Sequence, residues 1–276
     1  MIDGALACPR CCSGAVRKDG LDQQGAPAYR CRDCRRCFTA RSVTPFSGYR
    51  FPPAIIALAV RWYLRYRLSD ADVAEMLAER GVRVDPSSID ARVQEFAPRY
   101  EAAARSSRRV VGERWRVDET DVNVAGAWAD VYRARDEQDP IVDVYVSAAR
   151  ASADAAAFLR RAIATTGVPP TAVTTACAAA YPPALAAVLP EVLHETGTRP
   201  QQRIERDHQQ RKGRVRGMRG FKTIAGARVL CRAHAFLRNL RRGFSDLEGA
   251  LVATSLQGVP AVVSAWEALT ADLLTW

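Results

Sequence analysis

The pattern of apolar and polar positions predicts a helical region followed by a mixed region of strands and helices. Residues 53–97 carry apolar side chains at helical spacing and predict three helices, the first with Ile56, Val60 and Leu64 on one face. The mixed region is expected to hold strands and helices in the order strand 114–124, strand 127–135, strand 140–147, helix 152–165, strand 172–176, helix 180–188, strand 191–196 and helix 203–242.

Capping signals within the helical region favour a helix-turn-helix. Ser69 to Asp72 resembles a capping box, Gly81 ends the second helix, and Asp85 caps a third helix with Pro86 at its first position. A plain helical bundle is the alternative. In a helix-turn-helix the last helix enters the major groove of DNA. Its candidate contact residues are Ser87, Ser88 and Arg92.

The cysteines indicate a metal-binding region at the N-terminus, before the predicted helices. Six of the eight lie in the first 37 residues, and two Cys-x-x-Cys pairs stand 19 residues apart. That spacing predicts a zinc ribbon in which Zn²⁺ has a structural role, because four thiolates leave no open coordination position. The four ligands are Cys8, Cys11, Cys31 and Cys34. Cys12 and Cys37 are left over as alternative ligands or small buried residues, and we favour burial.

Charge points to a polyanion as partner. The net charge is +10, and residues 199–244 alone hold 14 basic and two acidic residues. A solvated helix face would explain part of this excess, but nucleic acid is the partner that it favours most. The DNA-binding candidates in this region are Arg211, Lys212, Arg214, Arg216, Arg219 and Lys222.

The sequence shows neither an export signal nor a membrane span. Charged and cysteine residues follow Met1 closely, and the longest uncharged run, residues 249–266, contains Ser, Gln and Pro. We therefore expect a cytoplasmic protein without membrane contact.

Asp118 is the candidate catalytic residue of the mixed region. It lies with Glu119 and Asp121 in a strand that is otherwise apolar and β-branched. A carboxylate buried in a strand is costly unless it is paired or bound to a metal. An arginine partner, a position at the sheet edge and a metal-binding catalytic role all remain open from the residues alone.

Several motifs in one order resemble the DDE transposases of bacterial insertion sequences, in particular the IS-six family. They include Trp115-Arg-Val-Asp-Glu-Thr120, Tyr132-Arg-Ala134, Ala178-Ala-Ala-Tyr-Pro182 and Ile204-Glu-Arg-Asp-His208. The resemblance covers roughly residues 5–244. It implies an α/β fold in which an RNase H-like mixed-sheet catalytic domain follows a zinc ribbon and a helix-turn-helix domain. The expected domains are zinc ribbon 1–45, helix-turn-helix 50–100, linker 101–112, RNase H-like DDE domain 113–244 and a C-terminal helical extension 245–276.

The resemblance also implies a two-metal site that this chain does not complete. On matching positions Asp118 is the first carboxylate, Glu205 is the third, and both would hold Mg²⁺. The second carboxylate is expected after the fourth strand, where this chain has Ala176. We therefore expect a transposase-family protein with a residual magnesium site and little or no catalysis.

Two alternatives stay open beside that expectation. One is an active two-metal transposase, and the other is a DNA-binding regulator that has no catalytic role. Whether the chain is an enzyme is thus uncertain from the sequence. The resemblance further implies double-stranded DNA as partner, as terminal inverted repeats and target, and a homodimer that holds two DNA ends.

Overall fold

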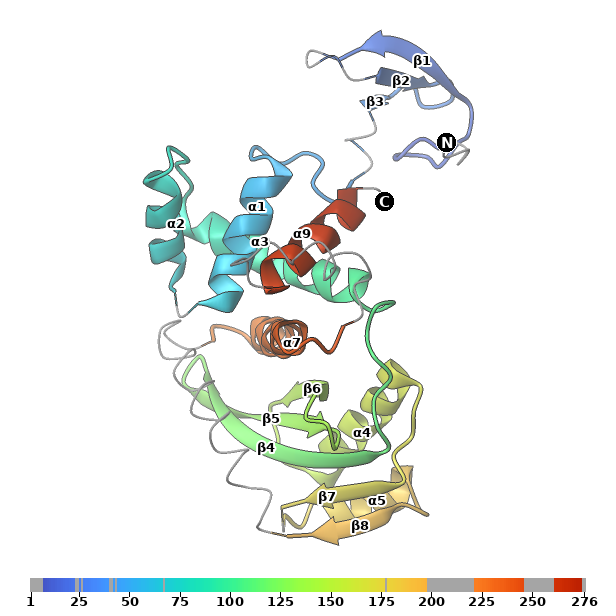
Figure 1. Ribbon diagram of the computed structural model, residues 1–276, viewed down its shortest axis with the longest axis vertical. Coiled ribbons are helices and arrows are strands. Elements are labelled where there is room, and N and C mark those ends of the chain that lie inside the picture. Colours follow the sequence, from blue (N-terminus) through green and yellow to red (C-terminus); the bar gives the residue numbers. More distant parts are fainter. Residues whose placement is uncertain are drawn as a thin grey trace.

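A computed structural model describes most of the chain. The described residues are 7–22, 25, 27–39, 42, 44–66, 68–176, 178–197, 221–245 and 261–274. Figure 1 shows a small sheet at one end, a group of helices in the middle and a larger sheet at the other end. In the described part, no helix is both long and apolar enough to cross a membrane.

The small sheet holds the N-terminal cysteines. Strands β1 (Val16–Leu21), β2 (Pro27–Cys31) and β3 (Cys37–Thr39) pair antiparallel in the order β1-β2-β3. Beneath the cysteines, Phe38 is 3% exposed and its ring centroid lies 6.0 Å from that of Tyr29. This apolar cluster is too small to hold such a sheet unaided, which is typical of ribbons that depend on a metal.

Three helices follow, and they start where the sequence predicts them. Helices α1 (Pro53–Arg65), α2 (Asp70–Ala78) and α3 (Pro86–Ala103) bury the predicted apolar faces. Ser69 and Asp72 form the capping box, and the Asp85 side chain accepts from the backbone N–H of Ser87. Gly81 has φ +77°, a conformation that glycine adopts without strain. Helix α3 runs to Ala103, so the first residues of the expected linker are helical.

The larger sheet has five strands in the order β6-β5-β4-β7-β8. Strands β4 (Arg114–Val124), β5 (Ala127–Arg135) and β6 (Ile141–Ser147) pair antiparallel. Strands β7 (Ala172–Thr175) and β8 (Leu193–Thr196) extend the sheet in parallel from β4. Helix α4 (Ser152–Thr166) connects β6 to β7, and α5 (Tyr181–Val188) connects β7 to β8. This is the RNase H-like order that the sequence predicts.

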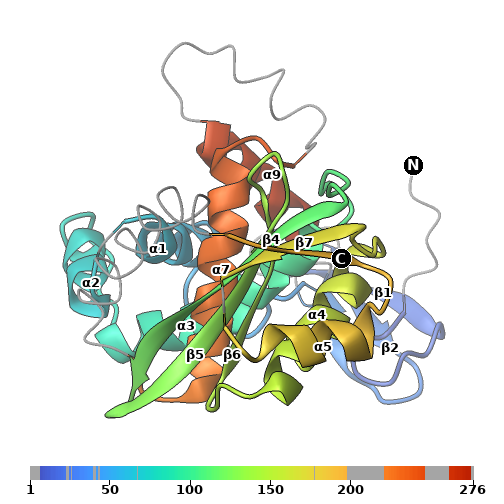
Figure 2. The same cartoon turned by 90° about the horizontal axis from the view of Figure 1, so that it is seen from below.

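Helices cover both faces of the larger sheet (Figures 1 and 2). On one face, α4 and α5 pack on Trp115, Val117 and Tyr132. On the other face, α7 (Ile224–Arg241) packs on a second core that includes Val122 and Val124. Residues alternate between the faces along β4, so Asp118 is on the α7 face and Glu119 is on the α4 and α5 face.

The second core joins the three helices to the sheet. It contains buried residues of α1, α2, α3, α7 and the C-terminal helix α9 (Ala261–Leu274). Trp266 of α9 stacks on Tyr100 of α3 at 4.1 Å between ring centroids, and its Nε1 donates to the carbonyl of Ala57 at 3.0 Å. Residues 53–103 therefore pack with the sheet and the last helix around one continuous core.

Candidate active site on the larger sheet and the N-terminal cysteine cluster

Asp118 faces an arginine of the neighbouring strand. Asp118 and Arg133 are directly opposite in the β4–β5 register, so their side chains leave the same face of the sheet. Arg133 Nη2 donates to Asp118 Oδ2 at 2.7 Å, and Arg133 Nε donates to Oδ1 at 3.2 Å. The two residues are 7% and 4% exposed. The arginine partner that the sequence left open as one explanation of Asp118 is therefore present.

This geometry neutralises the carboxylate. A bidentate guanidinium uses both carboxylate oxygens and fixes their plane. Because both side chains are buried, removing either one would take a charged partner away from the other inside the core, where that loss is costly. Asp118 is thus a buried anion with a built-in cation beside it.

The position after β7 lies beside Asp118. Val117 and Thr175 are partners in the parallel β4–β7 register, so the next residues along the two strands are Asp118 and Ala176. The Thr175 hydroxyl is hydrogen-bonded to His194 Nε2 of β8 at 2.8 Å. Ala176 brings no ligand atom to the place where the resemblance implies the second carboxylate.

The described residues do not fit a two-metal magnesium centre. Mg²⁺ takes oxygen ligands in an octahedron and is usually held by one or two carboxylates. At this position the described part of the chain offers Asp118 alone, and Arg133 already binds both of its oxygens. Glu205, the third expected carboxylate, lies outside the described residues.

The two other acidic residues of β4 serve different partners. Tyr181 donates its hydroxyl to Glu119 Oε2 at 2.5 Å, and burial together with the charge of Glu119 raises the pKa of Tyr181. Arg150 donates to both Asp121 and Asp130, each at 2.7 Å. Asp121 and Asp130 are opposite each other in the register, so Arg150 offsets a repulsion between like charges. The acidic cluster of the sequence is therefore split over both faces of the sheet.

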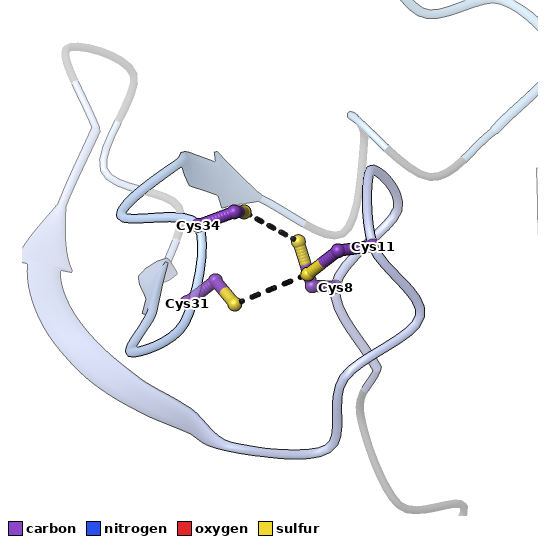
Figure 3. A group of neighbouring side chains, drawn as sticks. All are labelled: Cys8, Cys11, Cys31 and Cys34. Carbon is purple, nitrogen blue, oxygen red and sulfur yellow. Dashed lines mark hydrogen bonds between the residues drawn. The ribbon is translucent and has the colours of Figure 1, made fainter.

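Four cysteine side chains converge at the small sheet (Figure 3). The Sγ atoms of Cys8, Cys11, Cys31 and Cys34 lie within 4.8 Å of one another. Cys8 Sγ is 3.5 Å from Cys34 Sγ, and Cys11 Sγ is 3.6 Å from Cys31 Sγ. Tetrahedral zinc with Zn–S bonds near 2.3 Å places its sulfurs about 3.8 Å apart. The spacing therefore suits a four-thiolate zinc site.

The two cysteine pairs share one backbone conformation. The residue after the second cysteine has positive φ in both, +57° at Cys12 and +59° at Arg35. Such angles are uncommon outside glycine, and their recurrence marks two equivalent tight turns. Cys12 and Cys37 are exposed, so the expectation that they are small buried residues is wrong. Cys12 follows the first turn, and Cys37 begins β3 at the edge of the sheet, where neither is covered.

The predicted recognition helix offers few free side chains. Ser87 is exposed and Ser88 is half-buried at the start of α3. Arg92 pairs with Glu95 at 2.8 Å, and its guanidinium carbon lies 4.2 Å from the centroid of the Tyr49 ring. The arginine is therefore already engaged within the helical region. Lys222 is exposed just before α7. The other basic candidates lie outside the described residues: Arg211, Lys212, Arg214, Arg216 and Arg219.

Comparison with known proteins decides the class of the larger sheet and its helices. Residues 112–244 match a family model described as a DDE domain. This part of the chain is similar to the DDE domain of transposases. The stretch includes Asp118, Ala176 and the whole five-stranded sheet, and the predicted resemblance to insertion-sequence transposases is confirmed.

The relatives are transposases of Staphylococcus aureus. The chain is 36% identical over 129 residues to the transposase for insertion sequence-like element IS431mec of strain Mu50, over 47% of this chain and 58% of that protein. It is 35% identical, with the same coverage, to the transposase for insertion sequence element IS257 in transposon Tn4003. The chain thus spans little more than half the length of these relatives.

Two solved structures with weak similarity to this chain are retroviral. One is the HTLV-2 integrase catalytic core domain in complex with magnesium, with 13% identity, a TM-score of 0.30 and coverage of 59% of this chain and 86% of that one. Another is a simian T-cell lymphotropic virus intasome, with 15% identity, a TM-score of 0.29 and coverage of 59% and 49%. These scores are too low to support a fold assignment. The assignment of the DDE domain to the RNase H-like fold rests on the order and direction of its strands.

Sequence reasoning did not identify Arg133 or Arg150 as site residues. Arg133 lies inside one of the motifs of the resemblance, but its role depends on the β4–β5 register. That register could have been read from the short turn at Gly126, which has φ +90°. Arg150 lies between β6 and α4 and carried no signal in the sequence.

The buried ion pair can be tested with a double-variant cycle. We expect Arg133→Met alone to lower the free energy of unfolding by about 3–5 kcal/mol, because the buried Asp118 would lose its bidentate guanidinium partner. Adding Asp118→Leu should restore most of that loss, since both charges are then gone. Chemical denaturation measures each step, and simple addition of the two single losses would contradict the pairing.

An exposed ion pair of the same sheet is the control for that cycle. Arg114 and Glu195 are 3.0 Å apart with side chains 58% and 42% exposed. Arg114→Met should cost less than about 1 kcal/mol, because solvent screens such pairs.

Proposed function

We propose that this chain is a DNA-binding protein of the transposase type, belonging to the transposition and recombination machinery of an insertion sequence, and that this copy is impaired in catalysis. The DDE domain and the transposase relatives support the first part. The observation that carries the second part is the neighbourhood of Asp118, where Ala176 stands on one side and Arg133 binds the carboxylate on the other.

The size of the impairment follows from the ligands that are missing. Without a carboxylate at position 176, a metal ion would lose an anionic ligand, and Asp118 would have to be shared with a guanidinium group. A thousandfold loss of rate corresponds to about 4 kcal/mol of transition-state stabilisation. We expect at least that loss relative to a chain with a complete site. Glu205 keeps its proposed place as the third carboxylate.

Double-stranded DNA is the proposed partner, as terminal inverted repeats and as target. The excess of basic residues in 199–244 supports an electrostatic contact with the phosphate backbone. Ser87, Ser88 and Arg92 at the start of α3 remain the proposed base-reading set, and the engagement of Arg92 with Glu95 makes it the weakest of the three. A homodimer is proposed because transposition requires two DNA ends to be held together.

Structural zinc is the proposed cofactor of residues 8–34. The four thiol groups, their spacing and the two equivalent turns support it. Zinc bound by four thiolates contributes directly to folding, because the ligands cannot stay together in a sheet with so small a core.

The catalytic part of the proposal is tested by a strand-transfer assay with terminal repeats and magnesium. We expect the unaltered protein to join ends at a rate at least a thousandfold below that of the Ala176→Asp variant, for the reason given above. Equal and efficient joining by both proteins would show that the site is complete without a carboxylate at position 176, and the impairment would be refuted.

The matched control for this assay is Ala179→Asp. Ala179 is exposed three residues beyond Ala176, so its variant adds the same charge to the same loop without placing it beside Asp118. Rescue by Ala179→Asp would mean that added charge alone, rather than a ligand at position 176, restores the reaction.

The zinc proposal predicts one tightly bound ion per chain, measured by elemental analysis of the purified protein. Cys31→Ser should remove the ion and melt the β1–β3 sheet, seen as loss of amide-exchange protection in residues 16–39. Cys12→Ser and Cys37→Ser should keep both the ion and the protection, because these side chains are exposed. Zinc loss in Cys12→Ser, with retention in Cys31→Ser, would reassign the ligands.

A further inference from the structure

Four exposed arginines lie on the two tight turns of the N-terminal cysteine cluster. We call Arg10, Arg32, Arg35 and Arg36 the turn arginines. Arg10 lies inside the first cysteine pair, Arg32 lies inside the second, and Arg35 and Arg36 follow the second pair. The cysteine side chains of both turns point toward one another (Figure 3), so the turns flank a single cluster. The predicted DNA contacts do not include any of these arginines.

The acidic side chains close to the turns in sequence are engaged by other groups. Asp33, inside the second turn, accepts from the Ser13 hydroxyl at 2.5 Å. Asp19 accepts from Arg30 Nε at 2.8 Å, and Arg17 is 3.9 Å from it. Among the described residues, no hydrogen bond, ion pair or ring contact engages the side chain of a turn arginine. Their guanidinium groups are therefore available to a partner outside the described part of the chain.

The proposed zinc centre does not account for these four charges. A zinc ion bound by four thiolates has a net charge of about −2, so four guanidinium groups exceed it by about two. An arginine that neutralised the sulfurs would donate a hydrogen bond to them, and no described arginine side chain does so at the four clustered cysteines. Attraction through water at longer range is weak. The surplus of positive charge is therefore open to an added anion.

The turns hold the arginines in defined positions. The N–H of Cys12 donates to the carbonyl of Cys8 at 2.8 Å within the first turn. The N–H of Arg32 donates to the carbonyl of Ala15 at 2.8 Å, which ties the second turn to the chain that leaves the first. Guanidinium groups presented on a rigid frame lose little conformational freedom when they bind phosphate oxygens in pairs.

The surroundings favour duplex DNA over a single strand. Proteins that bind single strands stack the bases on exposed aromatic rings. Residues 7–39 contain two aromatic residues, Tyr29 and Phe38, and their rings pack on each other at 6.0 Å between centroids. Phe38 is 3% exposed and Tyr29 is half-buried, so neither offers a stacking surface. A duplex instead presents closely spaced phosphates along a regular backbone.

We propose that the turn arginines bind the phosphate backbone of duplex DNA. The zinc site then has a second role, because it fixes the two turns that present this contact. The contact is independent of base sequence and of Asp118. This inference rests on the proposed function, since it takes DNA as the polyanion.

Fluorescence anisotropy of the full zinc-loaded chain with a labelled duplex of random sequence tests the turn arginines. Each phosphate contact contributes about 0.9 to the slope of log affinity against log salt concentration. We expect Arg32→Gln and Arg36→Gln each to weaken binding roughly tenfold at low salt and to reduce the slope by about 0.9. Arg36→Lys should keep the slope, because it keeps the charge. Zinc analysis and thermal melting of each variant check that the turns are intact.

Arg17→Gln is the matched control within the same small sheet. Arg17 has a side chain 56% exposed on β1. It is paired in register with Arg30, the neighbour of Cys31, so it leaves the sheet on the face away from the cysteine cluster. Arg17→Gln removes the same charge and should leave the slope unchanged. If it weakens binding as much as Arg36→Gln does, charge anywhere in the sheet suffices and the turns are not the contact.

Two further outcomes separate this inference from the proposed function. If zinc-loaded Arg32→Gln and Arg36→Gln bind duplex like the unaltered protein, the turn arginines are not a DNA contact, while the proposed function stands. Loss of affinity for labelled polyglutamate, without loss for duplex, would identify an acidic protein as their partner instead. If the unaltered protein binds no duplex at all, the proposed function and this inference are both wrong.

Discussion

The buried pair of Asp118 and Arg133 is the interaction on which the DDE domain of this chain depends. It fixes the register of β4 and β5, the two central antiparallel strands, because a shift by one residue would send the two charges to opposite faces. It also determines what the site can do. Arg133 uses both oxygens of the Asp118 carboxylate, so this carboxylate has a structural role. Ala176, at the neighbouring position, supplies no second carboxylate that could bind a metal ion beside it.

The continuous core between the sheet and the helices fixes the positions of the proposed DNA contacts on α3. Helices α1 and α3 pack on α7, and α9 closes the group through Trp266 and Tyr100. The start of α3 is therefore held in a fixed relation to the DDE domain. A protein with little or no catalysis would keep that relation, since the core that maintains it does not involve Asp118. Binding and catalysis can be lost separately in such an architecture.

Much of the fold could be predicted from signals between neighbouring residues. The contacts between distant parts of the chain could not. Ser69, Asp85 and Gly81 act on their own neighbours, so helix ends could be read from the sequence. The spacing of the two cysteine pairs likewise predicted the four-cysteine cluster. The partner of Asp118 required a strand register, and the stacking of Trp266 on Tyr100 joins distant parts of the chain. The magnesium site was expected from a family resemblance. That resemblance could not show that Arg133 binds the Asp118 carboxylate.

The most direct test of this account is a Mn²⁺ titration of the zinc-loaded protein, followed by electron paramagnetic resonance of the free ion. Manganese takes the same oxygen ligands as magnesium and can be counted. If Arg133 neutralises Asp118 and Ala176 leaves the site incomplete, the protein should bind Mn²⁺ no more tightly than its Asp118→Asn variant. A stoichiometric site in the unaltered protein that disappears in Asp118→Asn would contradict the account.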